Sequence, residues 1–200
     1  MSKFNVEIEL TEEMLGTLPG DPEIYEKWIL SKIEEPEKQE EVKEEEIKTL
    51  PQLLKESTTG FAQNNGRPFL HSYMIKGFFK SAAKAMKHVE GAASKKLGWH
   101  NSLIDTLIFI QPREIVAVLP EGGKMGYCVR ALKAETPKGP RVTLARSETL
   151  PIGTKFRFTV NCLSDKLDQY IEEWFSYGEY SALGQWRNSG KGTIKYKILK

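Results

Sequence analysis

The sequence predicts a single α+β domain over residues 1–200, in the ferredoxin-like (RRM-like) order βαββαβ, with insertions and a glycine-rich loop before the last strand. Two observations predict this class. Several short segments carry an apolar residue at every second position, and two longer segments carry an apolar stripe at helical spacing. An apolar content of 40% is enough for one core.

Strands are predicted at both ends of the chain and in its middle. Residues 3–10 alternate apolar and polar side chains, as a half-buried strand does, and residues 193–200 alternate in the same way. The middle runs end at prolines or at turns that contain glycine. These strands are predicted at residues 105–112, 113–120, 125–135, 141–150 and 154–163.

Two helices are predicted, at residues 72–88 and 164–177. In the first, Ser72 is a suitable N-cap, and lysines line the side opposite the apolar stripe. The second ends where Gly178 fits the C′ position. Loops are predicted at residues 57–66 and 89–101.

Charge divides the chain unevenly. Residues 1–60 hold 7 Lys and 16 Asp and Glu, a net charge of −9, whereas residues 61–200 hold 22 Lys and Arg against 11 Asp and Glu, a net charge of +11. Residues 31–60 form an acidic insertion with too few apolar side chains to offset the entropy of ordering. The basic remainder favours a phosphate-rich partner, although an ordinary solvated surface would have the same composition.

The sharpest signal is the loop before the final strand. It has glycines at 184, 190 and 192, which permit positive φ and close backbone approach. Its backbone N–H groups could bind an anion, Arg187 and Lys191 add positive charge, and Trp186 could stack on a base. A flexible connection without a ligand is the alternative interpretation. The spacing is neither that of a Rossmann motif nor that of a Walker A loop.

This loop resembles the signature of the RAMP superfamily, the repeat-associated RNA-binding proteins of CRISPR systems. Residues 67–84 also resemble the helix start of backbone subunits in type III effector complexes, with Pro68 and Gly77 at matching places. Lys80 stands where that family usually has Arg, and His71 stands where small residues are common. The resemblance implies a groove for the RNA backbone between this helix and the glycine loop. Its implied phosphate contacts are Lys76, Lys80 and Arg187, beside Lys84 on the same basic side.

The same family often has a β-hairpin thumb that props RNA between bases. Residues 130–146 could be similar, because they are strongly basic and have proline and glycine at the tip. An exposed surface hairpin is the alternative. The basic residues of this segment are Arg130, Lys133, Lys138, Arg141 and Arg146.

Catalysis is not expected, although some members of the family cut RNA. Asp21 and His71 are weak candidates, because neither has a visible partner and both fit capping or packing roles. Cys128 and Cys162 are expected to be buried thiols. The histidines have no metal-ligand spacing, so no metal and no cofactor are predicted.

The preferred hypothesis is a RAMP-type protein that binds guide-like single-stranded RNA. It could assemble into filaments or with other effector subunits, or be a solitary phage or mobile-element relative. The alternatives are a metal-independent endoribonuclease with His71 as base, and an interaction protein whose acidic insertion docks on a partner or covers its own basic groove. No segment has the length of a membrane span and the first residues lack a signal-peptide layout, so a cytoplasmic location without a membrane partner is expected.

Overall fold

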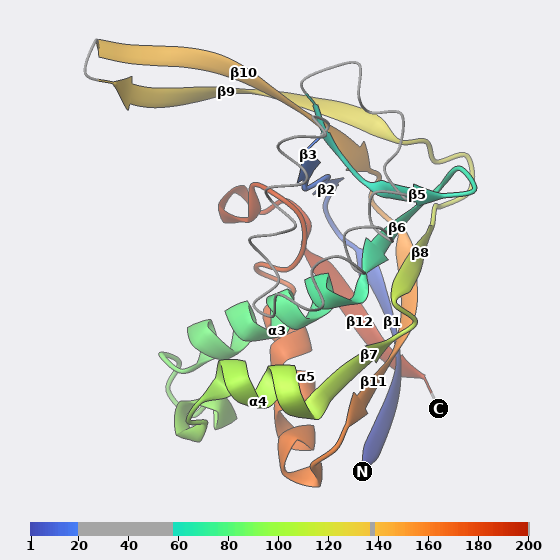
Figure 1. The fold of residues 1–200 in the computed structure, drawn as a ribbon, viewed down its shortest axis with the longest axis vertical. Helices are drawn as coiled ribbons and strands as arrows, with labels where there is room; N and C mark the ends of the chain where they lie inside the picture. The colour runs from blue at the N-terminus through green and yellow to red at the C-terminus, as the bar shows by residue number, and fades with distance from the viewer. Residues whose placement is uncertain (20–57, 137–138, 200) are drawn as a thin grey trace, which may run out of the picture.

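The structure, a computed structural model, describes residues 1–19, 58–136 and 139–199. It confirms the α+β class: antiparallel strands form the main sheet, and helices lie along one side of it (Figure 1). The acidic insertion up to residue 57, together with Asp21, lies outside the described residues.

The first and last strands of the chain lie side by side in the main sheet, with the last strand at its edge. β1 (Ser2–Leu10) pairs antiparallel with β12 (Ile194–Leu199) on one side and with β11 (Lys155–Cys162) on the other. Beyond β11 the sheet continues through β8 (Glu114–Val118), β6 (Arg67–His71) and β5 (Ala62–Asn64), in that order. β7 (Ile108–Gln111) also pairs with β11.

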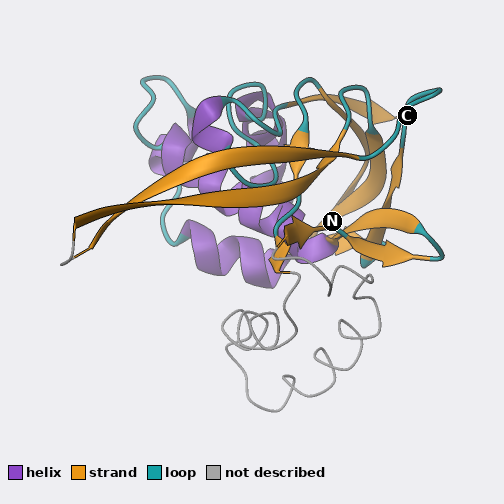
Figure 2. Ribbon diagram, turned by 90° about the horizontal axis from the view of Figure 1, so that it is seen from above, coloured by secondary structure: helices purple, strands orange, loops and turns teal. Residues whose placement is uncertain are grey.

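A long hairpin dominates the second sheet. β9 (Gly126–Thr136) and β10 (Gly139–Leu150) pair from Gly126↔Thr149 to Thr136↔Gly139, and their far end projects well beyond the body (Figure 2). Residues 130–146, where a basic hairpin was predicted, lie within this pair of strands, which extends beyond them at both ends. At its root, β10 pairs with the short strands β2 (Met14–Leu15) and β4 (Thr58–Gly60). β3 (Leu18–Pro19) in turn pairs with β4.

The helix layer is built from α3 (Ser72–Met86), α4 (His100–Leu107) and α5 (Asp168–Tyr177). The ring of Phe79 lies 5.4 Å from the ring of Trp174 and 5.1 Å from that of Phe175, so α3 and α5 share one aromatic core. Each such buried side chain contributes about 1.5–3 kcal/mol. Short 3₁₀ turns connect these elements, at η2 (Ala93–Lys96), η3 (Asp165–Leu167) and η4 (Arg187–Ser189).

The alternation predicted for the strands is confirmed where it was clearest. In β1, Val6 and Ile8 are fully buried while Glu7 lies between them on the other side of the sheet. In β11, Phe156 and Val160 are buried in the same way. The sheet therefore has one face under the helices and one outer face that carries polar side chains.

Several local predictions were wrong. Residues 105–107 belong to α4, because Leu103, Ile104 and Leu107 have helical spacing and pack toward the core. Part of the predicted loop at residues 57–66 forms β4 and β5, because these segments find long-range strand partners.

The predicted helix ends also differ. His71, not Ser72, is the N-cap of α3, and it makes no side-chain cap hydrogen bond. Gly178 ends α5 with φ −61°, a right-handed conformation. A Cβ there would lie 2.5 Å from a side-chain carbon of Ile194, so close packing, not a left-handed turn, requires this glycine. Within the described ranges, no helix combines the length and the apolar character needed to cross a membrane.

Candidate nucleic-acid interface

The glycine loop, Gly184–Gly192, is tied to the rest of the molecule at both ends. The N–H of Leu183 donates to the carbonyl of Gly192 at 3.1 Å, which closes the base of the loop. The N–H of Gly192 donates to Glu13 at 2.9 Å, and the N–H of Gln185 donates to Leu15 at 3.3 Å. The loop is thus positioned by the segment that follows β1.

The three glycines are needed for different reasons. Gly192 has φ +72°, and a Cβ there would lie 1.9 Å from the carbonyl oxygen of Leu183. Gly184 has φ +81°, and its Cβ would lie 2.6 Å from the carbonyl oxygen of Leu15. Gly190 also has positive φ, but nothing lies within 4 Å of its would-be Cβ. Two glycines therefore permit close approach, and the third permits only the turn.

Arg130 connects the root of the hairpin to this loop. Its guanidinium lies 5.5 Å from the ring centroid of Trp186 and donates a hydrogen bond to the side-chain oxygen of Gln185. Its other terminal nitrogen is buried and has no hydrogen-bond partner among the described residues. Trp186 itself has φ +57°, and the residue is 41% exposed.

An open pocket of about 850 Å³ lies where the loop, the hairpin root and α3 meet. Arginine provides bidentate donors for phosphate, and an aromatic face stacks on any base. Tyr180 is 74% exposed, which leaves most of its ring available. The side chains that give the pocket this chemistry are Ser81, Arg130, Tyr177, Tyr180, Trp186 and Arg187.

The structure brings together part of the predicted site. Gly184, Gly190, Trp186, Arg187 and Arg130 all line this one pocket. Helix α3 reaches it through Ser81. Ser81 is the one residue of α3 in the described lining of the pocket, and none of the predicted lysines of α3 belongs to this lining.

The predicted lysines of α3 point to a different side of the helix. Lys80 forms an ion pair with Asp105 of α4 at 2.6 Å, and Lys76 donates to the carbonyl of Asp105 at 3.1 Å. Lys76 also lies over the ring of Phe109 at 4.8 Å. Burial lowers the pKa of Lys76, with the charge of Asp105 opposing this shift and that of Lys80 adding to it. Lys84 remains exposed.

Other predicted cations lie apart from the pocket. Lys191 lies 3.4 Å from a carboxylate oxygen of Glu12 and 3.5 Å from one of Glu13. Burial lowers the pKa of Lys191, but these carboxylates outweigh burial and raise it overall. Arg146 stacks over the ring of Tyr127 at 4.0 Å. Lys138 and the side chains of Lys133 and Arg141 lie outside the described part of the chain.

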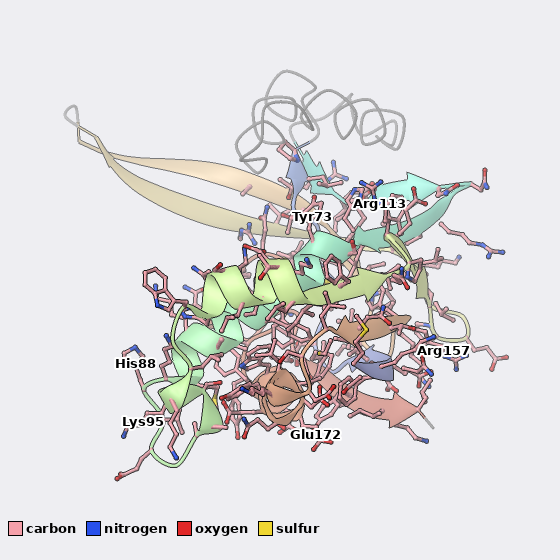
Figure 3. The ribbon with its side chains drawn as sticks, turned by 60° about the horizontal axis from the view of Figure 1, so that its bottom comes forward. Tyr73, His88, Lys95, Arg113, Arg157 and Glu172 are labelled. Atoms are coloured by element: carbon pink, nitrogen blue, oxygen red, sulfur yellow. The ribbon has the colours of Figure 1, made fainter. Side chains whose placement is uncertain are left out.

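His71 is in a packing environment. It is 8% exposed, stacked on the ring of Tyr73 at 5.2 Å and edge-on to Phe69 at 5.0 Å. Burial, and secondarily the charge of Arg113, lower its pKa to about 4. Figure 3 shows Tyr73 and Arg113 together at the hairpin end of the helix layer. The described residues contain no group of three side chains that could hold a metal ion.

Sequence reasoning missed the tyrosines and Ser81. Tyr177 was interpreted only as the end of a helix, and Tyr180 lies in the turn after it. Two aromatic residues spaced three apart at a helix end, next to a glycine loop, could have indicated a stacking surface. Ser81 carried no signal in the sequence, because its role depends on which side of α3 faces the loop.

The comparisons with known proteins concern the fold. No protein-family model matches the chain, and no curated protein matches it. With 13% identity and a TM-score of 0.52, 99% of the chain aligns with a chain in the cryo-EM structure of the type III-B Cmr-beta bound to cognate target RNA. The present chain spans only 59% of the length of that Cmr-beta chain.

Two further solved chains are similar over nearly the whole length. One belongs to a type IV-B CRISPR complex, with 12% identity and a TM-score of 0.50, over 99% of this chain and 90% of that one. The other is Cmr6 from Pyrococcus furiosus, with 10% identity and a TM-score of 0.49 over 98% of each chain. At these identities the likeness shows a shared, RAMP-like fold, which confirms the fold part of the predicted resemblance.

Proposed function

We propose that the chain is an RNA-binding protein of the RAMP type, which holds a guide-like single-stranded RNA along the pocket and the adjoining hairpin. One observation carries the proposal: the described residues that line the pocket include two arginines and three aromatic rings, and no carboxylate. Cations bind phosphates, and exposed rings stack on bases. The RAMP-like fold, shared with a chain from a complex bound to target RNA, supports the same class of ligand.

The fold prediction is extended in the same proposal. The antiparallel order β12–β1–β11–β8, with α3 and α5 on one face, supports a ferredoxin-like core. The hairpin β9–β10 then corresponds to the predicted thumb, and its root contributes Arg130 to the pocket. RNA that enters the pocket would therefore touch both the glycine loop and the hairpin.

A direct binding measurement tests the proposal. We expect an Arg130→Ala, Arg187→Ala double variant to bind fluorescently labelled single-stranded RNA roughly 30- to 1,000-fold more weakly at low salt, because each arginine provides a charge-assisted contact worth about 1–2 kcal/mol. Arg187→Ala alone keeps the Arg130–Gln185 hydrogen bond and should lose a smaller part. Unchanged affinity in both variants would overturn the proposal.

The matched control removes the same amount of charge elsewhere. Lys155 and Arg157 lie on the outer face of the sheet, where both are paired with carboxylates. The double variant Lys155→Ala, Arg157→Ala should therefore bind RNA within about 2-fold of the wild type, because these cations are already neutralised. An equal loss in both double variants would mean that affinity follows net charge and not this pocket.

Assembly is a further part of the proposal. A RAMP-type subunit that repeats along RNA would bind longer RNA as a series of copies. Light scattering on complexes with RNA of increasing length should then show a mass that rises in steps of one chain, 22.8 kDa. A single copy on every length of RNA would favour the solitary form, and association without RNA would favour assembly through protein contacts alone.

A further inference from the structure

A second basic surface lies at the far end of α3, away from the hairpin. We call it the Trp99 corner, residues 84–100. Trp99 is 88% exposed, the highest value among the large apolar side chains of the described residues. In Figure 3, His88 and Lys95 mark this end of the helix layer, opposite Tyr73 and Arg113.

The backbone of this corner is held in place. A carboxylate of α5, Glu173, accepts hydrogen bonds from the N–H groups of Ala93 at 2.6 Å and Ser94 at 3.1 Å. The indole N–H of Trp174 donates to the hydroxyl of Ser94 at 2.9 Å. Ser94 is fully buried by these contacts. The 3₁₀ turn that precedes Trp99 is therefore anchored to α5.

Trp99 also adopts an uncommon conformation. Its φ is +49°, in the left-handed region that disfavours residues other than glycine, and its carbonyl accepts the N–H of Leu103 at 3.1 Å. Such strain persists only where the surroundings fix it, and it concentrates at functional sites. A glycine would adopt this backbone conformation without strain. The backbone therefore does not account for a tryptophan at this position.

Within the described ranges, the cations of the corner lack carboxylate partners. No ion pair of the described residues involves Lys84, Lys87, Lys95 or Lys96, in contrast to Lys80 one turn earlier in α3. Burial lowers the pKa of His100, and the charges of Lys87 and Lys84 lower it further. Both ammonium groups are therefore near the imidazole of His100. The corner therefore combines unpaired positive charge with an exposed aromatic face.

Helix α3 leads from the pocket to the corner. Ser81 lines the pocket. Lys84, one turn further along the helix, lies about 60° around the axis from Ser81, and Lys87, the C-cap, lies about 120° around it, on the side of Lys76 and Lys80. At 1.5 Å per residue, Ser81 and the position of Lys87 are about 9 Å apart along the helix axis. A strand that leaves the pocket would therefore have to follow α3 over this distance and bend around the helix to reach the corner.

We propose that the Trp99 corner is a second contact for the same single strand, in which Trp99 stacks on a base and the neighbouring lysines bind phosphates. This inference rests on the proposed function, because it supplies the exit path for RNA held in the pocket. A membrane surface is less well matched, since a single ring and the half-exposed Val89 offer little apolar area for insertion.

The test compares two lengths of RNA. Trp99→Ala should weaken binding of an oligonucleotide of about 16 nucleotides roughly 5- to 50-fold, and leave one of about 4 nucleotides unchanged, because the short one fills only the pocket. Trp99→Phe keeps an aromatic face and should retain most of the affinity. Val89→Ala, in the turn that follows α3 within the same corner, is the matched control and should bind both lengths like the wild type.

The outcomes separate the two proposals. If Trp99→Ala binds the long RNA like the wild type while Arg187→Ala binds it weakly, the second contact is wrong and the pocket stands. If Trp99→Ala is weak on the long RNA and Arg187→Ala is unaffected, the corner binds RNA without the pocket. Loss of binding to phosphatidylserine vesicles in Trp99→Ala, with RNA binding unchanged, would reassign the corner to lipid and overturn the inference.

Discussion

The outer face of the sheet and the pocket beside the glycine loop both carry positively charged side chains, but these side chains have different partners in the two regions. On the outer face, Arg157 contacts Glu7 at 2.5 Å and Lys195 contacts Glu9 at 2.8 Å. At the pocket, Arg130 faces a tryptophan ring and an amide oxygen. The partners of the cations therefore distinguish the two regions, whereas the number of cations does not.

Strand register explains why the outer face neutralises itself. Glu7 lies directly opposite Arg157, and Glu9 lies directly opposite both Lys155 and Lys195 on the two neighbouring strands. Cross-strand neighbours of opposite charge attract, so hydrogen bonds and charges from these cations lower the pKa of both glutamates. RNA recognition on the open sheet face, as in the RRM, would have to break this ladder.

The largest expected effect comes from damage to the scaffold of the pocket. Gly192→Ala places a methyl group against the backbone carbonyl of Leu183, which cannot move aside as a flexible side chain could. The substitution also forces alanine to adopt a positive φ. We expect it to lower the free energy of unfolding by roughly 3 kcal/mol, measured by urea denaturation.

Gly190→Ala provides the matched comparison. Its φ is similar, +79°, but its would-be Cβ meets nothing within 4 Å, so only the conformational cost of about 1 kcal/mol applies. Equal destabilisation by the two substitutions would show that the close approach at Gly192 does not constrain the loop.

Acid should destabilise the junction from which α3 extends to the pocket. The folded pKa of His71 is lowered to about 4 from an ordinary 6.5, so between these values the unfolded chain binds more protons and stability falls as pH decreases. We expect His71 to account for a loss of about 2 kcal/mol between pH 7 and pH 5.

Subtraction isolates this contribution. His71→Phe keeps a ring beside Tyr73 and removes the titration, so its unfolding free energy should change less between pH 7 and pH 5 than that of the wild type. The same pH dependence in both proteins would mean that the imidazole of His71 is protonated in the folded state as readily as in the unfolded one.

The sequence predicted the parts of this comparison that depend on local patterns. The alternation in β1 and β11 located the two faces of the sheet, and the glycine spacing located the loop. The partners of the cations depend on contacts between distant segments. Asp105 takes up Lys76 and Lys80 only because residues 100–107 form a helix, which the apolar run at residues 107–110 concealed.

The pocket shows the same limit. Arg130 and Trp186 are 56 positions apart, and their contact depends on how the hairpin root packs on the loop. Likewise, Lys191 was expected to bind RNA on account of its position in the loop, but the segment after β1 brings Glu12 and Glu13 to it. Positive charge can be counted in a sequence, and its availability cannot.

Release of the outer-face cations tests the comparison most directly, with a smaller effect. Glu7→Gln together with Glu9→Gln removes the carboxylates opposite Arg157, Lys155 and Lys195 and keeps side chains of similar shape. If ion pairing with Glu7 and Glu9 is what keeps these cations from binding RNA, we expect RNA affinity to rise roughly 3- to 10-fold at low salt. The gain should vanish at high salt, where counterions compete.

The control must change net charge equally without releasing a cation. Glu121 and Glu172 are exposed and take part in no ion pair of the described residues, and Figure 3 shows Glu172 on the helix layer, away from Arg157. Glu121→Gln with Glu172→Gln should therefore raise affinity far less than the Glu7, Glu9 pair. A similar gain in both double variants would show that long-range charge governs binding, and the contrast between paired and unpaired cations would then not explain where RNA binds.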